Sequence, residues 1–150
     1  VEVEEVDFDL VSEYDLAEYY RIDMVERVFN MYENKGINLS IQNVSIRGKL
    51  RPITSFRTLY REIVKEINSM EPNLLYELAL KEDSSRVDGL ITESFCTLNE
   101  VSDSIEVKTN KGIVYLPFSR TRKGIIDRIV YVLKHSSLGL FNVTLKLRNI

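Results

Sequence analysis

The chain has 150 residues, which is enough for one domain with a hydrophobic core of its own. Its 44% hydrophobic and 29% charged residues are typical of a folded globular protein, and the low counts of 6 Gly and 3 Pro argue against disorder or a long flexible linker. The single Cys96 excludes an internal disulfide, and the short apolar runs exclude a membrane-spanning helix. We therefore expect an intracellular protein, cytoplasmic or nucleoid/nuclear, with no membrane partner.

Charge alternates along the chain, although its net value is only -3. Residues 1–35 hold 11 acidic and 3 basic side chains, and residues 68–106 hold 9 acidic and 2 basic ones. Residues 36–67 hold 6 basic and 2 acidic side chains, and residues 107–150 hold 9 basic and 1 acidic. Such asymmetry indicates either a partner of defined charge or acidic and basic segments that neutralise each other inside the fold.

The first predicted elements are a charged edge strand over residues 1–10 and a helix over residues 12–34, which ends before Gly36. The apolar side chains of this helix cover an arc of roughly 200°, about twice what one core contact needs. We therefore predict burial on two sides, with residues 1–36 as an arm used in association. A helix buried deep inside a single chain is the alternative. The predicted association surface consists of Val25, Phe29 and Tyr32.

The middle of the chain predicts two short strands around Gly48, then a helix over residues 55–70 capped by Ser55. A second helix is predicted over residues 72–82, because Pro72 suits the first turn of a helix. From Ser84 to Glu100 the pattern is weak, and it predicts one short strand at "VDGLIT" and another around "FCTL".

The last third predicts a hairpin, with residues 104–109 paired to residues 113–118 around the turn "NKG". A helix over residues 119–136 follows, with Ser119 as its cap. A final strand, "LFNVTLKLRNI", places one face inward, consisting of Phe141, Val143, Leu145 and Leu147. These elements predict a single α+β domain, with an antiparallel or mixed sheet and helices mainly on one face.

Basic side chains cluster on three of these elements. At the start of the helix over residues 119–136, each cation opposes the helix dipole by roughly 0.3–1 kcal/mol, whereas free backbone N–H groups with adjacent cations suit a phosphate. On the helix over residues 55–70, Arg57, Arg61 and Lys65 repeat at every fourth position, where like charges repel. The hairpin around Gly48 carries a third cluster. The predicted anion-binding residues are Arg47, Lys49, Arg51, Arg57, Arg61, Arg120, Arg122 and Lys123.

These clusters predict a non-catalytic nucleic-acid-binding module of a larger assembly, which contacts backbone phosphates with little dependence on sequence. The alternative is a protein-interaction or oligomerisation domain without nucleic acid. In that case the same cations pair with the Glu and Asp residues of the N-terminal third or of a partner.

One segment indicates an enzyme as a second alternative. Glu106-Val107-Lys108 places an acid and a base on the same face of a strand, and Asp88 lies upstream. In this respect the segment resembles the metal-dependent nuclease superfamily whose signature is an Asp followed by Glu-x-Lys. The resemblance implies that Asp88 and Glu106 hold a divalent ion and that Lys108 orients the attacking water. We nevertheless expect no catalytic site, no cofactor and no metal.

Overall fold

The computed structural model describes residues 19–84 and 95–150. In this part of the chain the helices are α1 (Ile22–Glu33), α2 (Phe56–Met70), α3 (Leu74–Ser84) and α4 (Arg122–Lys134). The strands are β1 (Tyr19–Arg21), β2 (Leu39–Ile46), β3 (Lys49–Arg51), β4 (Ser104–Lys108), β5 (Ile113–Pro117) and β6 (Val143–Asn149). The mixture of helices and antiparallel strands confirms the predicted α+β class.

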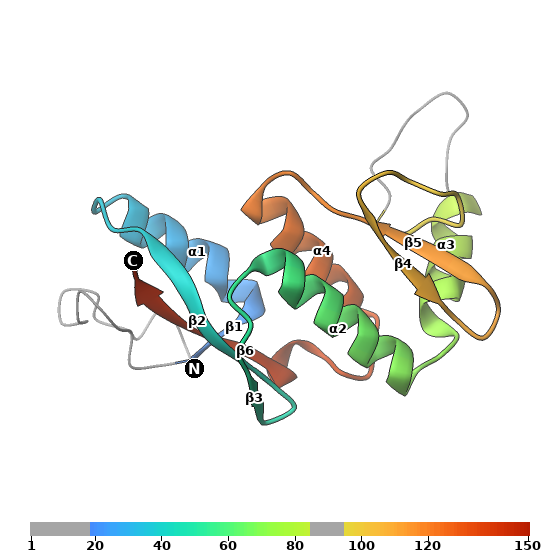
Figure 1. Cartoon of the computed structure of the whole chain (residues 1–150), viewed down its shortest axis with the longest axis horizontal. Coiled ribbons are helices and arrows are strands. Elements are labelled where there is room, and N and C mark those ends of the chain that lie inside the picture. The colour runs from blue at the N-terminus through green and yellow to red at the C-terminus, as the bar shows by residue number, and fades with distance from the viewer. Residues whose placement is uncertain (1–18, 85–94) are drawn as a thin grey trace.

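The strands form two separate antiparallel sheets. The larger sheet has the order β1-β6-β2-β3, and the smaller one is the hairpin β4-β5. Figure 1 shows α2 and α4 between the two sheets, with α1 beside the larger sheet and α3 beside the smaller one. None of the helices in the described ranges combines the length and the apolar character that crossing a bilayer requires.

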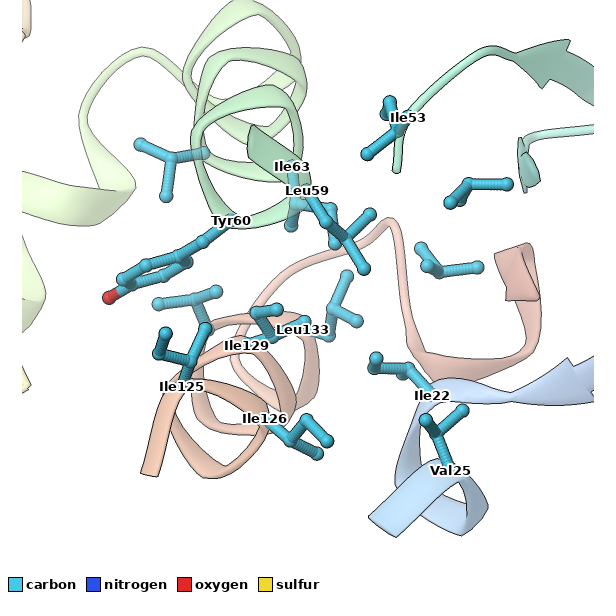
Figure 2. Packing of buried hydrophobic residues seen from close by; sticks show 14 of the residues in the cluster. Ile22, Val25, Ile53, Leu59, Tyr60, Ile63, Ile125, Ile126, Ile129 and Leu133 are labelled. Atoms are coloured by element: carbon cyan, nitrogen blue, oxygen red, sulfur yellow. The ribbon is translucent and has the colours of Figure 1, made fainter. Parts of the chain in front are cut away.

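The core forms where the apolar faces of α2 and α4 meet each other and the larger sheet. Side chains three or four residues apart lie on one side of a helix, which brings Leu59 and Ile63 of α2 toward Ile129 and Leu133 of α4 (Figure 2). These four side chains are all fully buried.

A β-bulge sets which side chains of β2 face the helices. Ile41 and Val44 are three residues apart, and both are buried, although strict alternation would place them on opposite faces. The register with β6 shifts between Ile41 and Asn43, which inserts one residue and returns Val44 to the inner face. On β6, Val143, Leu145 and Leu147 are buried, as predicted.

The first helix is shorter than predicted. Residues 19–21 form β1, which pairs with β6 through Tyr20 opposite Leu145, and the helix begins only at Ile22. The predicted helix over 12–34 is therefore wrong at its start, because pairing with a distant strand overrides the local helical pattern. Residues 1–18, with the predicted edge strand over 1–10, lie outside the described residues.

The predicted association surface on α1 lies inside the chain. Val25, Phe29 and Tyr32 are only 0%, 4% and 3% exposed. α1 packs against α4 and the larger sheet, and the ring of Phe29 contacts the ring of Phe56 edge-on, with centroids 5.6 Å apart. The wide apolar arc is thus explained by deep burial within one chain, which was the alternative. This observation corrects the expectation that these three side chains await a partner.

Other element boundaries follow the sequence closely. α2 has the predicted Ser55 cap, whose hydroxyl accepts a hydrogen bond from the Thr58 N–H at 3.1 Å. The β4-β5 hairpin is confirmed, with Lys108 opposite Ile113. α3 begins at Leu74 instead of residue 72.

The last third holds two further corrections. α4 is capped by Thr121 instead of Ser119, since the Thr121 hydroxyl accepts from the Gly124 N–H at 3.0 Å. Phe141 lies in a 3-10 turn and is 77% exposed, because the final strand begins only at Val143. Near "FCTL" the structure has a single bridge between Thr97 and Tyr115, and "VDGLIT" lies outside the described residues.

Candidate nucleic-acid interface

Arg122, at the start of α4, is bonded to the acidic side chains of α1. Its Nε and Nη2 donate to the two oxygens of Glu26 at 2.7 and 3.0 Å, and its Nη1 and Nη2 donate to those of Glu33 at 3.0 Å each. The guanidinium also lies over the ring of Phe29, 4.5 Å from its centroid. These bonds raise the pKa of Arg122 and lower that of Glu33. Arg122 therefore ties α4 to α1 and does not point toward a ligand.

The predicted phosphate clasp at the start of α4, which consists of Arg120, Arg122 and Lys123, is not assembled as a unit. Lys123 pairs with Asp127 one turn along α4, at 2.9 Å, and both side chains are exposed. The Gly124 N–H, which a phosphate needs, is already bonded to the Thr121 hydroxyl. Of the three predicted clasp residues, Arg120 is the one without a carboxylate within ion-pair distance in the described part of the chain.

Arg57, Arg61 and Arg120 instead gather around Phe118 and Asp103. The Nη2 and Nη1 of Arg57 donate to the two oxygens of Asp103 at 2.6 and 3.3 Å, and its guanidinium lies 3.9 Å from the centre of the Phe118 ring. The Arg61 guanidinium lies 5.3 Å from the same ring centre. The hydrogen bonds from Arg57 lower the pKa of Asp103, and the charges of Arg57, Arg61 and Arg120 lower it further.

This cluster continues along the exposed side of α2 to Lys65, one turn beyond Arg61. We call Arg57, Arg61, Lys65 and Arg120 the α2 basic surface. All four side chains are exposed. Asp103 is the one carboxylate that forms an ion pair with any of them among the described residues. The α2 basic surface therefore keeps most of its positive charge.

The third cluster, Arg47, Lys49 and Arg51 on the β2-β3 hairpin, carries less net charge than the α2 basic surface. Two acidic side chains of α2, Glu62 and Glu66, pair with its arginines. Arg51 Nη2 bonds to Glu66 Oε1 at 2.6 Å, and Arg47 Nη1 bonds to Glu66 Oε2 at 3.3 Å. Arg51 Nη1 also lies 3.6 Å from Glu62 Oε2. The bonds from Arg51, and then from Arg47, lower the pKa of Glu66. Lys49 has no carboxylate within ion-pair distance in the described ranges.

The nuclease alternative depends on a residue that the structure does not describe. Glu106 and Lys108 are both exposed on one face of β4, as the strand pattern predicted. Asp88 lies outside the described residues, so its position relative to Glu106 cannot support a shared ion. Within residues 19–84 and 95–150, no group of three His, Cys, Asp or Glu side chains is placed to hold a metal.

Sequence reasoning missed two residues that organise the α2 basic surface. Phe118 supports two guanidiniums, and its only signal was its position directly before the basic segment "SRTR". Asp103 lies 46 residues from Arg57 in a loop with no regular pattern, and no sequence signal pointed to their contact.

Comparisons with known proteins return no match: no protein-family model, no curated protein and no solved structure resembles this chain.

Proposed function

We propose that this chain is a non-catalytic nucleic-acid-binding module that contacts backbone phosphates through the α2 basic surface. One observation carries the proposal. In residues 19–84 and 95–150, four exposed cations from α2 and from the segment before α4 have one ion-paired acid among them, Asp103, which bonds to Arg57. Backbone phosphates supply the matching negative charge, and binding of this kind releases counterions.

The arrangement of the cations suits a phosphate chain. Arg61 and Lys65 are one turn apart, about 6 Å along the axis of α2, so they form a line that an extended strand can follow. Phe118 supports the flat faces of Arg57 and Arg61, which reduces the entropy that each guanidinium loses on binding. Contacts with phosphates alone carry little sequence information, so the module binds many sequences with similar affinity.

The test is a fluorescence-anisotropy titration with mixed-sequence DNA and RNA at two salt concentrations. Binding weakens as salt rises, and the double variant Arg61→Gln/Lys65→Gln lowers the slope of log K against log salt by about 2, since each lost phosphate contact removes roughly 1. Lys123→Gln is the control, because Lys123 is also exposed but is paired with Asp127 and lies outside the α2 basic surface. Absence of binding at low salt, or equal binding by the double variant, overturns the proposal.

A second candidate is a protein-interaction domain without nucleic acid. Five of the eight predicted anion-binding residues are paired with acids of their own chain, which favours structural roles for them: Arg47, Arg51, Arg57, Arg122 and Lys123. Light scattering over a range of protein concentrations, with no nucleic acid present, measures self-association directly. Association together with failure to bind DNA and RNA supports this second candidate.

A further inference from the structure

A small hollow lies between the β2-β3 hairpin and α2. The turn residues Arg47 and Gly48 both have positive φ, 54° and 79°, as a two-residue hairpin turn requires. The resulting register pairs Ile46 with Lys49 and Val44 with Arg51. Since paired residues of antiparallel strands share a face, Lys49 and Arg51 lie on the side of the sheet that faces α2.

The hollow has a volume of about 280 Å³ and is lined by Ile46, Arg47, Lys49, Arg51 and Glu66. Glu66 holds both guanidiniums, one on each carboxylate oxygen, at 2.6 Å from Arg51 and 3.3 Å from Arg47. A guanidinium has five N–H donors, so each arginine keeps donors for a further acceptor. One carboxylate thus fixes two arginines beside the same space. We call this space the hairpin hollow.

The hairpin hollow keeps a small excess of positive charge among the described residues, although Glu62 and Glu66 neutralise part of it. Its lining carries three cations and one carboxylate. Glu62 is a second acid, 3.6 Å from Arg51, but it does not line the hollow. Arginines held in place by a carboxylate, together with a lysine, are the groups that bind a compact oxyanion through several charge-assisted hydrogen bonds.

We infer that the hairpin hollow binds a phosphomonoester, namely the terminal phosphate of a nucleic-acid strand. This inference rests on the proposed function. A phosphomonoester carries a charge of about -1.5 to -2 at pH 7 and presents three acceptor oxygens, whereas an internal phosphodiester carries a single charge. Glu66, which lines the hollow, directly follows Lys65 in α2, so the hollow lies near this end of the α2 basic surface, about 100° further around the helix. In this proposal, the end of a strand that follows that surface occupies the hollow.

The first experiment titrates the full chain with inorganic phosphate, followed by amide NMR shifts at pH 7.5 and pH 5.5. Inorganic phosphate loses most of its second charge between these pH values, so its affinity for the hollow falls by about tenfold or more. Sulfate, which stays doubly charged, is the control for changes in the protein. Among the described residues, the charged groups that line the hollow are Arg47, Lys49 and Arg51 on the hairpin and Glu66 on α2, and Glu62 lies behind Arg51.

We expect changes in amide chemical shift that are confined to the hairpin and to the facing turns of α2. The affinity for sulfate is expected to be the same at both pH values. Equal phosphate affinity at both pH values, or a parallel loss of sulfate affinity, overturns the inference. Shifts centred on the start of α4 overturn it as well.

The second experiment compares strands with a 5′-phosphate, a 3′-phosphate or neither. A longer unphosphorylated strand of equal net charge controls for bulk electrostatics. We expect about tenfold tighter binding of one phosphorylated strand, because its terminal group gains charge-assisted hydrogen bonds. Lys49→Gln removes most of this preference, and Lys134→Gln, at the far end of α4, leaves it intact.

The outcomes separate this inference from the proposed function. Binding of all strands with no preference for a terminal phosphate overturns the inference and leaves the proposed function standing. Binding of inorganic phosphate without binding of any strand overturns both. Tighter binding of a phosphoserine peptide than of a phosphorylated strand overturns the assignment to strand ends.

Discussion

At the scale of single residues, the ion pairs of this chain divide its cations into two groups. Arg122 is held by Glu26, Glu33 and the ring of Phe29, and its side chain is only 27% exposed. Lys123, its neighbour, is 70% exposed and bonded to one acid on its own helix. Adjacent cations that look alike in sequence therefore have different roles, and substitutions distinguish them.

Arg122→Gln is expected to lower the free energy of unfolding by about 1–2 kcal/mol, because it leaves Glu26 and Glu33 without their shared partner in a partly buried setting. Urea denaturation followed by circular dichroism measures the change. Lys123→Gln, the matched control, leaves the unfolding midpoint unchanged. An equal loss in both variants contradicts the structural role of Arg122.

Glu66 makes stability depend on pH. Its pKa in the folded chain lies below the ordinary value of 4.5, because Arg51 and Arg47 bond to its carboxylate. The folded state therefore binds fewer protons than the unfolded state, and the stabilisation is present above about pH 4.5 and is lost as the pH falls through the lowered value. We expect Glu66→Gln to flatten the fall of the unfolding midpoint between pH 5 and pH 3. An unchanged slope contradicts this role.

At the scale of elements, the entry to α4 depends on the absence of one side chain. A Cβ at Gly124 would lie 1.9 Å from the hydroxyl of Ser119 and 2.5 Å from its Cβ. The hydroxyls of Ser119 and Thr121 bond to backbone N–H groups of this turn, at 3.3 Å to Thr121 and 3.0 Å to Gly124. The turn before α4 therefore requires glycine at position 124 because any Cβ would clash with Ser119. The φ angle of Gly124 is not positive, so its backbone conformation is not the reason.

Gly124→Ala is expected to lower the midpoint of thermal unfolding and to cost about 1–3 kcal/mol, since the added carbon overpacks the turn. Ser119→Gly removes both clashing atoms, so the double variant recovers part of the loss. Calorimetry of the single and double variants provides the comparison. If the second substitution brings no recovery, the contact with Ser119 is not the cause.

At the scale of the whole molecule, α1 is part of the core. Val25 is fully buried, and Ile22 and Val25 lie close to α4 in Figure 2. The acids of the same helix meet Arg122, so the acidic first third and the basic last third neutralise each other at this contact. Internal neutralisation was one of the two explanations that the alternating charge left open.

Val25→Ala is therefore expected to destabilise the fold by about 1–3 kcal/mol, as the loss of buried methyl groups does elsewhere. The molar mass measured by light scattering stays that of the unsubstituted chain. A change in mass without a loss of stability instead indicates that Val25 contributes to association.

The sequence alone determined the elements whose signals are local. The apolar spacing of α2, its Ser55 cap and the turn of the β4-β5 hairpin depend on residues within one or two turns of each other. The three basic clusters could also be identified from the sequence, because the positions of charged residues are given by the sequence itself. From these signals the α+β class followed directly.

Only the tertiary structure decided which cations remain available for a ligand. Arg122 meets Glu26 across 96 positions, and Arg57 meets Asp103 across 46, and no local pattern encodes such distances. The same holds for β1, which is a strand only because β6 lies beside it. Ion pairs and strand pairing depend on which distant segments of the chain the fold brings together. That arrangement is set by burial of the apolar side chains of the whole chain, not by any local pattern.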